Sequence, residues 1–426
     1  MSSKNYFYKR IIHELNINIF IFRILIVFLI IAYLSAFITG FRLPNLWSLN
    51  YYIMNFFDGF IRRGAAGTIL YIFGDLRANY YFIITIQFLV FIVLNYFIIC
   101  AVIKDRKIIF IYSIFLISPF GGYFFHEIGY IDQLIFLVFG IIIIVDNKFF
   151  SAIMLFISLF IHELSIFTII PLYFSYQYVK GSSLVSLIPT FLTCLLGMGL
   201  LYFYFQRISS EDLSSYLTYL TPRANYEIRR DFYGLFHTNF SISDPISHLH
   251  FTEEDYRNIK LISPLFLIIG YLFAKMKFLM QYETRWGSTF SATPGEQETA
   301  ALLTVSTPNP VTPRRASVIF NWIKIIFLFF IGIMTPAVPL IMGMVAWDCA
   351  RWIFISGCIA LFCCYFTREA LSWRITMLVS TVFIVFSIYG NFFYFDGYLP
   401  RAKNWDSIIN FFTVQIKEEI TTIPKV

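Results

Sequence analysis

The sequence predicts an all-α protein that crosses a membrane through about ten or eleven helices. Of its 426 residues, 58% are hydrophobic and only 13% are charged, whereas soluble domains carry about 25% charged residues. The apolar residues form long runs, and these lack the alternating pattern of an outer-membrane β-barrel strand. We therefore expect a polytopic membrane protein with several short or broken helices and one large non-cytoplasmic loop.

Apolar runs and basic loops define the expected order of the helices. Nine of them are expected at about 17–39, 81–103, 108–119, 133–145, 183–205, 261–274, 318–343, 352–366 and 375–392. The first run follows a polar, basic N-terminus and is too long for the apolar region of a signal peptide. The basic loop 104–107, like the N-terminus, is expected in the cytoplasm by the positive-inside rule. The C-terminus is then expected on the non-cytoplasmic side.

The apolar stretch 149–178 carries His162 and Glu163 near its centre. The stretch is long for one helix, and a His–Glu pair in the middle of a bilayer is costly. Two short helices, at about 149–161 and 164–178, would place the pair near the outer surface, because interrupted helices are tolerated where they line a protein cavity. A single tilted helix is the alternative.

Two kinds of polar segment interrupt the membrane domain, which is expected to comprise 1–280 and 318–426. Residues 40–80 and 206–260 are expected as outer loops, the second with mixed charges, many aromatic residues and helical pieces. Residues 281–317 are rich in Ala, Thr, Pro, Gly and Ser, unlike the Ile- and Phe-rich remainder, and such a composition predicts disorder. This segment is interpreted as a cytoplasmic linker or an insertion, and no function is assigned to it.

The segment 55–67 combines one acid, two arginines and three glycines directly after the first apolar region. Ionisable groups at the edge of a membrane-spanning run are costly to keep there, which makes them candidate functional residues. Asp58 is the candidate catalytic residue. Arg62 and Arg63 are candidate partners of an anionic substrate, because the guanidinium group binds phosphate in a forked geometry.

The expected topology brings further ionisable residues to the same outer side. The candidate substrate-binding residues are Arg62, Arg63, His126, Glu127, Asp132, His162, Glu163, Asp348 and Arg351. In sugar transfer from a lipid carrier, a carboxylate such as Asp58 can take the proton of the attacking hydroxyl. The leaving phosphate or diphosphate gains charge in the transition state, which arginine side chains stabilise. Aromatic side chains would line the sugar and the polyprenyl tail.

Several of these motifs also have a purely structural interpretation. Asp58 and Arg62 are spaced i,i+4, and Asp348 and Arg351 are spaced i,i+3, so each pair could be a local ion pair. Asp132 could cap the helix that follows it.

The histidines and glycines have such alternatives as well. His126 could be an ordinary solvated loop residue. His162 and Glu163 could form a buried structural pair or a proton relay in a transporter. The three glycines of 55–67 could serve only the close packing of helices.

The remaining composition argues against other classes of site. The six cysteines lie in or beside apolar runs without CxxC or CxxH spacing, which indicates small core residues rather than a zinc site or a disulfide framework. His162-Glu163 is not followed by the second histidine of an HExxH motif. We expect no cofactor, and nothing indicates a divalent cation. The net charge of +7 is assigned to cytoplasmic loops rather than to nucleic-acid binding.

The pattern around Asp58 resembles integral-membrane glycosyltransferases of the GT-C superfamily. These enzymes have a catalytic acid in the first outer loop, a short amphipathic helix after it and short helices around a lipid-facing cavity. The overall build is also similar to bacterial O-antigen polymerases and phage-type serotype-converting glucosyltransferases. Asp58 occupies the place of the catalytic acid, with Arg62 and Arg63 beside it, although it stands alone rather than in an Asp-Asp or Glu-x-Asp pair.

The resemblance implies a hexosyltransferase of the bacterial inner membrane that acts in O-antigen or capsule biosynthesis. Its partners would be a polyprenyl-linked sugar donor, a lipid-linked glycan acceptor and membrane lipids. Asp58 would be the general base, the arginines would bind the donor phosphate, and His162 and Glu163 would position sugar hydroxyls. Both a polymerase and a single-sugar transferase fit this description. The alternatives are a polysaccharide or small-molecule transporter or flippase, and a structural membrane subunit.

Overall fold

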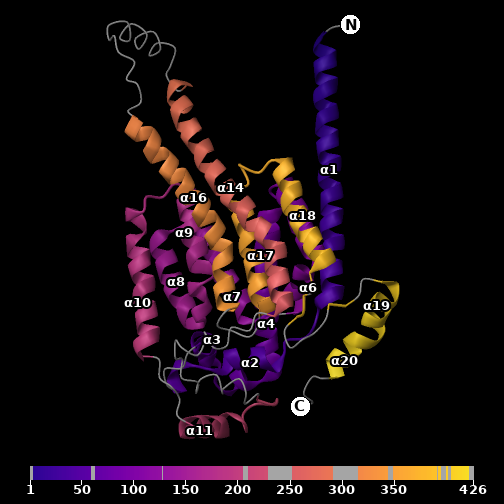
Figure 1. Ribbon diagram of the computed structural model, residues 1–426. Coiled ribbons are helices and arrows are strands. Elements are labelled where there is room, and N and C mark those ends of the chain that lie inside the picture. The colour runs from indigo at the N-terminus through magenta and orange to yellow at the C-terminus, as the bar shows by residue number, and fades with distance from the viewer. Residues whose placement is uncertain are drawn as a thin grey trace.

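The computed structural model describes a helical bundle with short helices at one end (Figure 1). It describes residues 3–58, 63–126, 128–204, 210–228, 252–290, 315–343, 349–390, 392–394, 400–401 and 404–421. The regular structure within these ranges is helical and contains no strand. The expected all-α class is therefore confirmed.

The bundle consists of helices that run roughly along one common direction (Figure 1). They are α1 (Ser3–Gly40), α4 (Tyr80–Val102), α5 (Arg106–Ile117), α7 (Ile131–Val145), α8 (Lys148–Ile161), α9 (Ile169–Val179), α10 (Ile188–Tyr204), α14 (Glu253–Phe290), α16 (Arg315–Gly343), α17 (Cys349–Phe366) and α18 (Trp373–Tyr389). The short helix α6 (Pro119–His126) follows α5 after a sharp bend. A short 3-10 turn, η4 (Val185–Leu187), precedes α10.

The short helices gather at the end of the bundle away from the N-terminus (Figure 1). They are α2 (Leu46–Ile53), η1 (Phe56–Asp58), α3 (Ala65–Leu70), η2 (Tyr71–Ala78), α11 (Ser210–Leu220), α19 (Trp405–Asn410), η6 (Phe411–Gln415) and α20 (Ile416–Thr421). The described parts of 40–80 and residues 210–220 therefore form helical pieces at the same end of the molecule.

Within the described residues, five helical segments are long and apolar enough to cross a membrane. They are Asn18–Gly40, Tyr80–Val102, Glu253–Leu279, Trp322–Met342 and Cys349–Phe366. The α5–α6 pair, which is bent by 74°, would add a sixth if it forms one span. Large apolar side chains along α1, such as Ile24, Val27 and Ile30, are more than half exposed, as expected of helices that face lipid rather than water. The chain is thus a helical, multi-pass membrane protein.

The interruption of the stretch 149–178 is confirmed, and the single tilted helix is wrong. Helix α8 ends at Ile161, and His162 adopts an extended conformation (φ −162°, ψ 132°). The backbone N–H of Leu164 then donates to His162 Nδ1 at 3.1 Å, which caps the short 3-10 turn η3 (Glu163–Ile166). Helix α9 follows and returns to the opposite end of the bundle (Figure 1).

Helix α14 differs most from its expected bounds. It extends from Glu253 to Phe290, well beyond the expected 261–274, so parts of both 206–260 and 281–317 are helical. Its first turn carries Glu253, Glu254 and Asp255, acids that interact favourably with the positive end of the helix dipole. Helix α16 likewise begins at Arg315. Residues 291–314, the remainder of the segment expected to be disordered, lie outside the described residues.

The end of the bundle that lies opposite the short helices is held by lysine side chains. Lys107 Nζ donates to the carbonyl oxygen of Leu371 at 2.7 Å, and Lys275 Nζ donates to that of Ala370 at 2.8 Å. Both carbonyls belong to the turn between α17 and α18. Cations at this place satisfy carbonyl groups that a helix end leaves without partners.

The bend between α5 and α6 places the backbone of α6 against the end of α1. Proline begins the new helix at Pro119, since it needs no N–H partner there. A Cβ on Gly40, the last residue of α1, would overlap the carbonyl oxygen of Gly122 in α6. Glycine at position 40 therefore lets the end of α1 contact the backbone of α6 directly.

Gly40→Ala should lower the thermal unfolding midpoint of the purified protein, because the added methyl meets a backbone atom that cannot rotate away. Overpacking of this kind costs about 1–3 kcal/mol. Gly199→Ala is the matched control, since a Cβ on Gly199 in α10 would have no other atom within 4 Å. The midpoint is measured by fluorescence in detergent micelles. An equal midpoint for both variants would contradict the close contact between α1 and α6.

Candidate functional site: a cluster of paired charges

Ionisable and aromatic side chains from distant parts of the chain meet at the end of the bundle that carries α2 and α3. We call them the charge cluster. It consists of Tyr51 in α2, Arg63 before α3, Tyr130 and Asp132 at the start of α7, His162 and Glu163 between α8 and α9, and Arg351 in the first turn of α17.

Arg63 and Glu163 form the first ion pair of the charge cluster. Arg63 Nη2 donates to Glu163 Oε1 at 2.6 Å, and Nε lies 3.1 Å from both carboxylate oxygens. Arg63 Nη1 also donates to the hydroxyl of Tyr51 at 3.3 Å. Burial acts to lower the pKa of Arg63, but the adjacent Glu163 carboxylate outweighs it and raises the pKa above its ordinary value. The guanidinium therefore stays charged.

The backbone of Arg63 adopts a left-handed conformation, with φ of 67°. Such a conformation costs about 1–3 kcal/mol in a residue other than glycine and persists only where the surroundings impose it. Here the forked contact with Glu163 and the start of α3 two residues later hold it. The ion pair thus fixes Arg63 directly before α3.

His162 lies beside this pair as a neutral ring. Its Nδ1 is 3.3 Å from Glu163 Oε2, yet the same atom accepts a hydrogen bond from Leu164 N–H at 3.1 Å. An imidazole nitrogen that accepts a hydrogen bond carries no proton. We therefore assign the proton to Nε2, and the approach to Glu163 is not an ion pair.

Asp132 and Arg351 form the second ion pair. Arg351 Nε and Nη2 donate to the two carboxylate oxygens of Asp132, both at 2.7 Å. The side chains are only 8% and 9% exposed, and the guanidinium lies 4.5 Å from the ring of Tyr130. This two-bond geometry is the strongest arrangement for an arginine and a carboxylate. It joins the first turns of α7 and α17.

Tyr51 connects the two ion pairs. Its ring centroid lies 5.7 Å from that of Tyr130 and 5.8 Å from that of His162. Tyr51 therefore contacts Arg63 through its hydroxyl, while Tyr130 contacts Arg351 through its ring. The charge cluster is one continuous group rather than two separate pairs.

The loop before α7 is held by the side-chain amide of Gln133 and the hydroxyl of Tyr52. Gln133 Nε2 donates to the carbonyl of Phe124 at 2.9 Å, and its Oε1 accepts from Gly129 N–H at 2.9 Å. The hydroxyl of Tyr52 donates to the carbonyl of Gly129 at 2.9 Å. Gly129 has φ of 75°, a conformation that glycine adopts at little cost. These bonds position Tyr130 and Asp132 against α2.

The structure brings five of the expected site residues together: Arg63, Asp132, His162, Glu163 and Arg351. His126 is buried at the end of α6, 5.2 Å from the ring of Tyr394, so the interpretation as a solvated loop residue is wrong. Arg62, Glu127 and Asp348 lie outside the described residues. Asp58 is the last residue of η1, but its side chain is likewise outside them.

One structural interpretation of the sequence is also wrong, and another is untested. Arg351 is paired with Asp132 from a different helix, and a further local pair with Asp348 stays a prediction because Asp348 lies outside the described residues. Asp132 does not cap α7, because Tyr130 is the capping residue and provides no side-chain hydrogen bond. The packing interpretation of the glycines holds for Gly67, where a Cβ would overlap the carbonyl of Met54.

Tyr51 and Tyr130 are the cluster residues that sequence reasoning missed. The chain contains 28 tyrosines, so no spacing distinguishes these two. Among the described residues, no three His, Cys, Asp or Glu side chains come together in an arrangement that could hold a metal ion. Comparison with known proteins found no matching family model, no matching curated protein and no matching solved structure.

Removing one partner of the buried pair should destabilise the protein strongly. Asp132→Asn or Arg351→Gln alone leaves an uncompensated buried charge or polar group, at a cost of about 3–5 kcal/mol. The double variant should lose less free energy of unfolding than the two single variants lose together, because no charge remains unpaired. Denaturant unfolding in mixed micelles measures the change in the free energy of unfolding for the two single variants and the double variant.

The exposed ion pair between Asp146 and Lys180, whose side chains are 40% and 46% exposed, provides the matched control. Asp146→Asn and Lys180→Gln should each cost only about 0–1 kcal/mol. Additive losses at Asp132 and Arg351 would show that the two residues do not interact in the membrane-embedded protein.

Proposed function

We propose that this protein is a glycosyltransferase of the bacterial inner membrane. It transfers a sugar from a polyprenyl-linked donor to a lipid-linked glycan during surface polysaccharide biosynthesis, as a polymerase or as a single-sugar transferase. The observation that carries the proposal is the charge cluster itself, whose residue Arg63 follows the candidate residues Asp58 and Arg62 in the chain.

The position of the buried ionisable groups favours chemistry at one membrane surface over transport. Among the described side chains, the buried histidine, aspartate and arginine residues are His126, Asp132, His162 and Arg351. All four lie at the helix ends near α2. A transporter is expected to carry ionisable groups through the depth of several helices. Beyond the charge cluster, the buried polar side chains of the described residues, such as Asn95, Thr335 and Ser356, are uncharged.

The contacts change the role proposed for two arginines. Arg63 and Arg351 each direct two nitrogen atoms at a carboxylate, so each pair is close to neutral and attracts a phosphate only weakly. We therefore assign them a positioning role: Arg63 anchors the segment after Asp58, and Arg351 locks α17 onto α7. Arg62 remains the proposed partner of the donor phosphate.

The proposed reaction uses Asp58 as general base. Asp58 takes the proton of the acceptor hydroxyl while the hydroxyl oxygen forms a bond to the anomeric carbon. The bond from that carbon to the carrier's phosphate oxygen breaks, and the electron pair stays on the phosphate or diphosphate. Arg62 stabilises this charge. His126, Glu127 and Asp348 are proposed to contact sugar hydroxyls, with His162 and Glu163 supporting the same surface.

The orientation follows from the distribution of basic residues. The end of the bundle opposite the charge cluster carries Lys104, Lys107, Lys180, Lys275 and Arg368, and the positive-inside rule assigns such an end to the cytoplasm. The N-terminus is then cytoplasmic, and the C-terminus and the charge cluster are non-cytoplasmic. Together with the five long apolar segments, α5, α7, α8, α9, α10 and α18 would give eleven crossings, the odd number that termini on opposite sides require.

Asp58→Asn should abolish function, because an amide cannot accept the proton and loss of a general base typically costs about 10²–10⁴-fold in rate. The test uses a strain that lacks the gene, complemented with wild type, Asp58→Asn or Asp75→Asn at equal membrane expression. Asp75 is the matched control, since it lies in η2 of the same outer segment with a side chain that is 84% exposed. Surface polysaccharide is analysed by gel electrophoresis and sugar composition.

Loss of long chains in the deletion strain and in the Asp58→Asn strain would identify a polymerase. Unchanged chain length with one sugar missing would identify a single-sugar transferase. Full rescue by Asp58→Asn would remove Asp58 from the mechanism. Accumulation of lipid-linked sugars on the cytoplasmic face of the deletion strain would instead indicate a flippase.

A charge exchange tests the positioning role of Arg63. Arg63→Glu alone and Glu163→Arg alone should each lose activity, whereas the double variant should recover part of it by restoring the ion pair in reverse. If Arg63 instead bound the donor phosphate directly, the double variant should stay inactive, because it would place a carboxylate next to the phosphate. Activity is measured in membranes at matched expression, with the KM for the donor determined for every active variant.

A further inference from the structure

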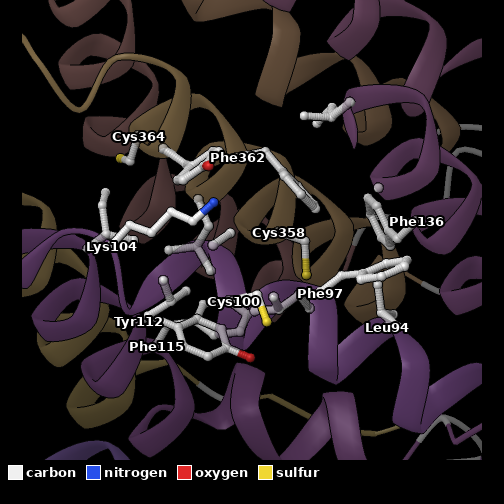
Figure 2. Close-up of a pocket in the computed structure, with 18 of the residues that line it drawn as sticks. Leu94, Phe97, Cys100, Lys104, Tyr112, Phe115, Phe136, Cys358, Phe362 and Cys364 are labelled. Carbon is white, nitrogen blue, oxygen red and sulfur yellow. The ribbon is translucent and has the colours of Figure 1, made fainter. Parts of the chain in front are cut away.

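A separate apolar cavity lies among α4, α5, α7 and α17. Its volume is about 330 Å³, at the lower end of the range for sites that hold small ligands. Leu94, Phe97, Phe136 and Phe362 are among the residues that line it (Figure 2). Most of its surface is apolar, so water inside it would find few hydrogen-bond partners.

The cavity is distinct from the charge cluster. Asp132 and Arg351 occupy the first turns of α7 and α17, whereas Gly140 and Tyr365 line the cavity further along the same two helices. The cavity therefore lies in the half of the bundle near the α4–α5 turn, which is the basic end. Glycosyl transfer at the charge cluster does not require it.

The cavity opens on the outer surface of the bundle. Tyr96 and Ile144 belong to its lining and are 63% and 62% exposed. In a membrane protein, such exposed apolar side chains face hydrocarbon chains rather than water. A lipid chain can thus enter sideways from the bilayer.

One cation lies at the cavity. The side chain of Lys104 extends toward the centre of the lining residues, with its ammonium group directed inward (Figure 2). Within the described part of the chain, Lys104 makes no ion pair and no side-chain hydrogen bond. Its basic neighbours are engaged: Lys107 Nζ bonds to carbonyls of the α17–α18 turn, and Arg106 Nη1 donates to Asn18 Oδ1 at 2.8 Å. Asp105 caps α5 through Lys107 N–H.

We propose that this cavity binds one acyl chain of an anionic phospholipid whose phosphate pairs with Lys104. The apolar lining suits an acyl chain, and the lateral opening lets that chain enter from the bilayer. The ammonium group of Lys104 suits a negatively charged headgroup at the membrane surface. The limited volume favours a single acyl chain over the much longer, branched chain of a polyprenyl phosphate. The site is independent of the proposed glycosyl transfer.

The test measures lipid binding to the purified full-length protein by native mass spectrometry. The protein is titrated with phosphatidylglycerol and with phosphatidylcholine of the same acyl chains. Wild type should bind phosphatidylglycerol more tightly than phosphatidylcholine. Lys104→Gln should reduce this preference about fivefold, which corresponds to the contribution of one cation near an anionic headgroup. Lys148→Gln is the matched control, since Lys148 is an exposed lysine at the same end that donates to Ser186 Oγ at 2.8 Å.

A second variant tests the cavity itself. A Cβ on Gly140 would meet only the ring of Phe97, at 3.5 Å, so Gly140→Leu can fill the space without displacing backbone. It should remove the tightest phosphatidylglycerol site, whereas Gly199→Leu, on an open face of α10, should leave it intact. An unchanged preference in Lys104→Gln would overturn the proposal. The proposal would also be overturned if the protein bound polyprenyl phosphate and phosphatidylglycerol could not displace it. The cavity would then be a site for the carrier lipid.

Discussion

The two ion pairs of the charge cluster are the interaction on which the rest of this end of the molecule depends. A lone guanidinium or carboxylate beside a bilayer is expensive, and each of these four groups is instead matched by a partner from another element. The pairs join α7 to α17 and the segment before α3 to the break between α8 and α9. Elements that are far apart in the sequence thereby form one polar surface, with Tyr51 between the two pairs.

The break at His162 shows how local and tertiary requirements agree. The ring caps η3, which satisfies a backbone N–H that the interrupted helix leaves open. The next residue, Glu163, then points at Arg63 rather than into the hydrocarbon. A continuous helix would have provided the backbone N–H and C=O groups with hydrogen-bond partners, but it would have placed the Glu163 carboxylate inside the hydrocarbon region. Arg63 thus supplies the partner that makes the interruption favourable, and the contact with Glu163 helps to hold Arg63 in its left-handed conformation.

Sequence reasoning predicted what depends on composition and on the cost of charges in lipid. It predicted the helical membrane class, the break at 162–163, and the shared position of Arg63, Asp132, His162, Glu163 and Arg351. It did not predict which of these residues pair, because the partner of Arg351 is set by the packing of α7 against α17, whereas local spacing pointed to Asp348. The length of α14 was missed for a related reason: residues 281–290 have a composition typical of disorder, yet they continue a helix whose earlier turns pack in the bundle.

The pairing of Asp132 with Arg351 also has a consequence for biogenesis. The two residues are 219 positions apart in the chain, so a ribosome that adds about 5–20 residues per second reaches Arg351 roughly 10–45 s after Asp132. During this interval α7 has no cation from α17, and its first turn must remain at the water-facing edge of the membrane or carry a protonated carboxyl. Insertion of α7 and its final docking are thus separate events, and the polar surface is complete only after α17 has been made.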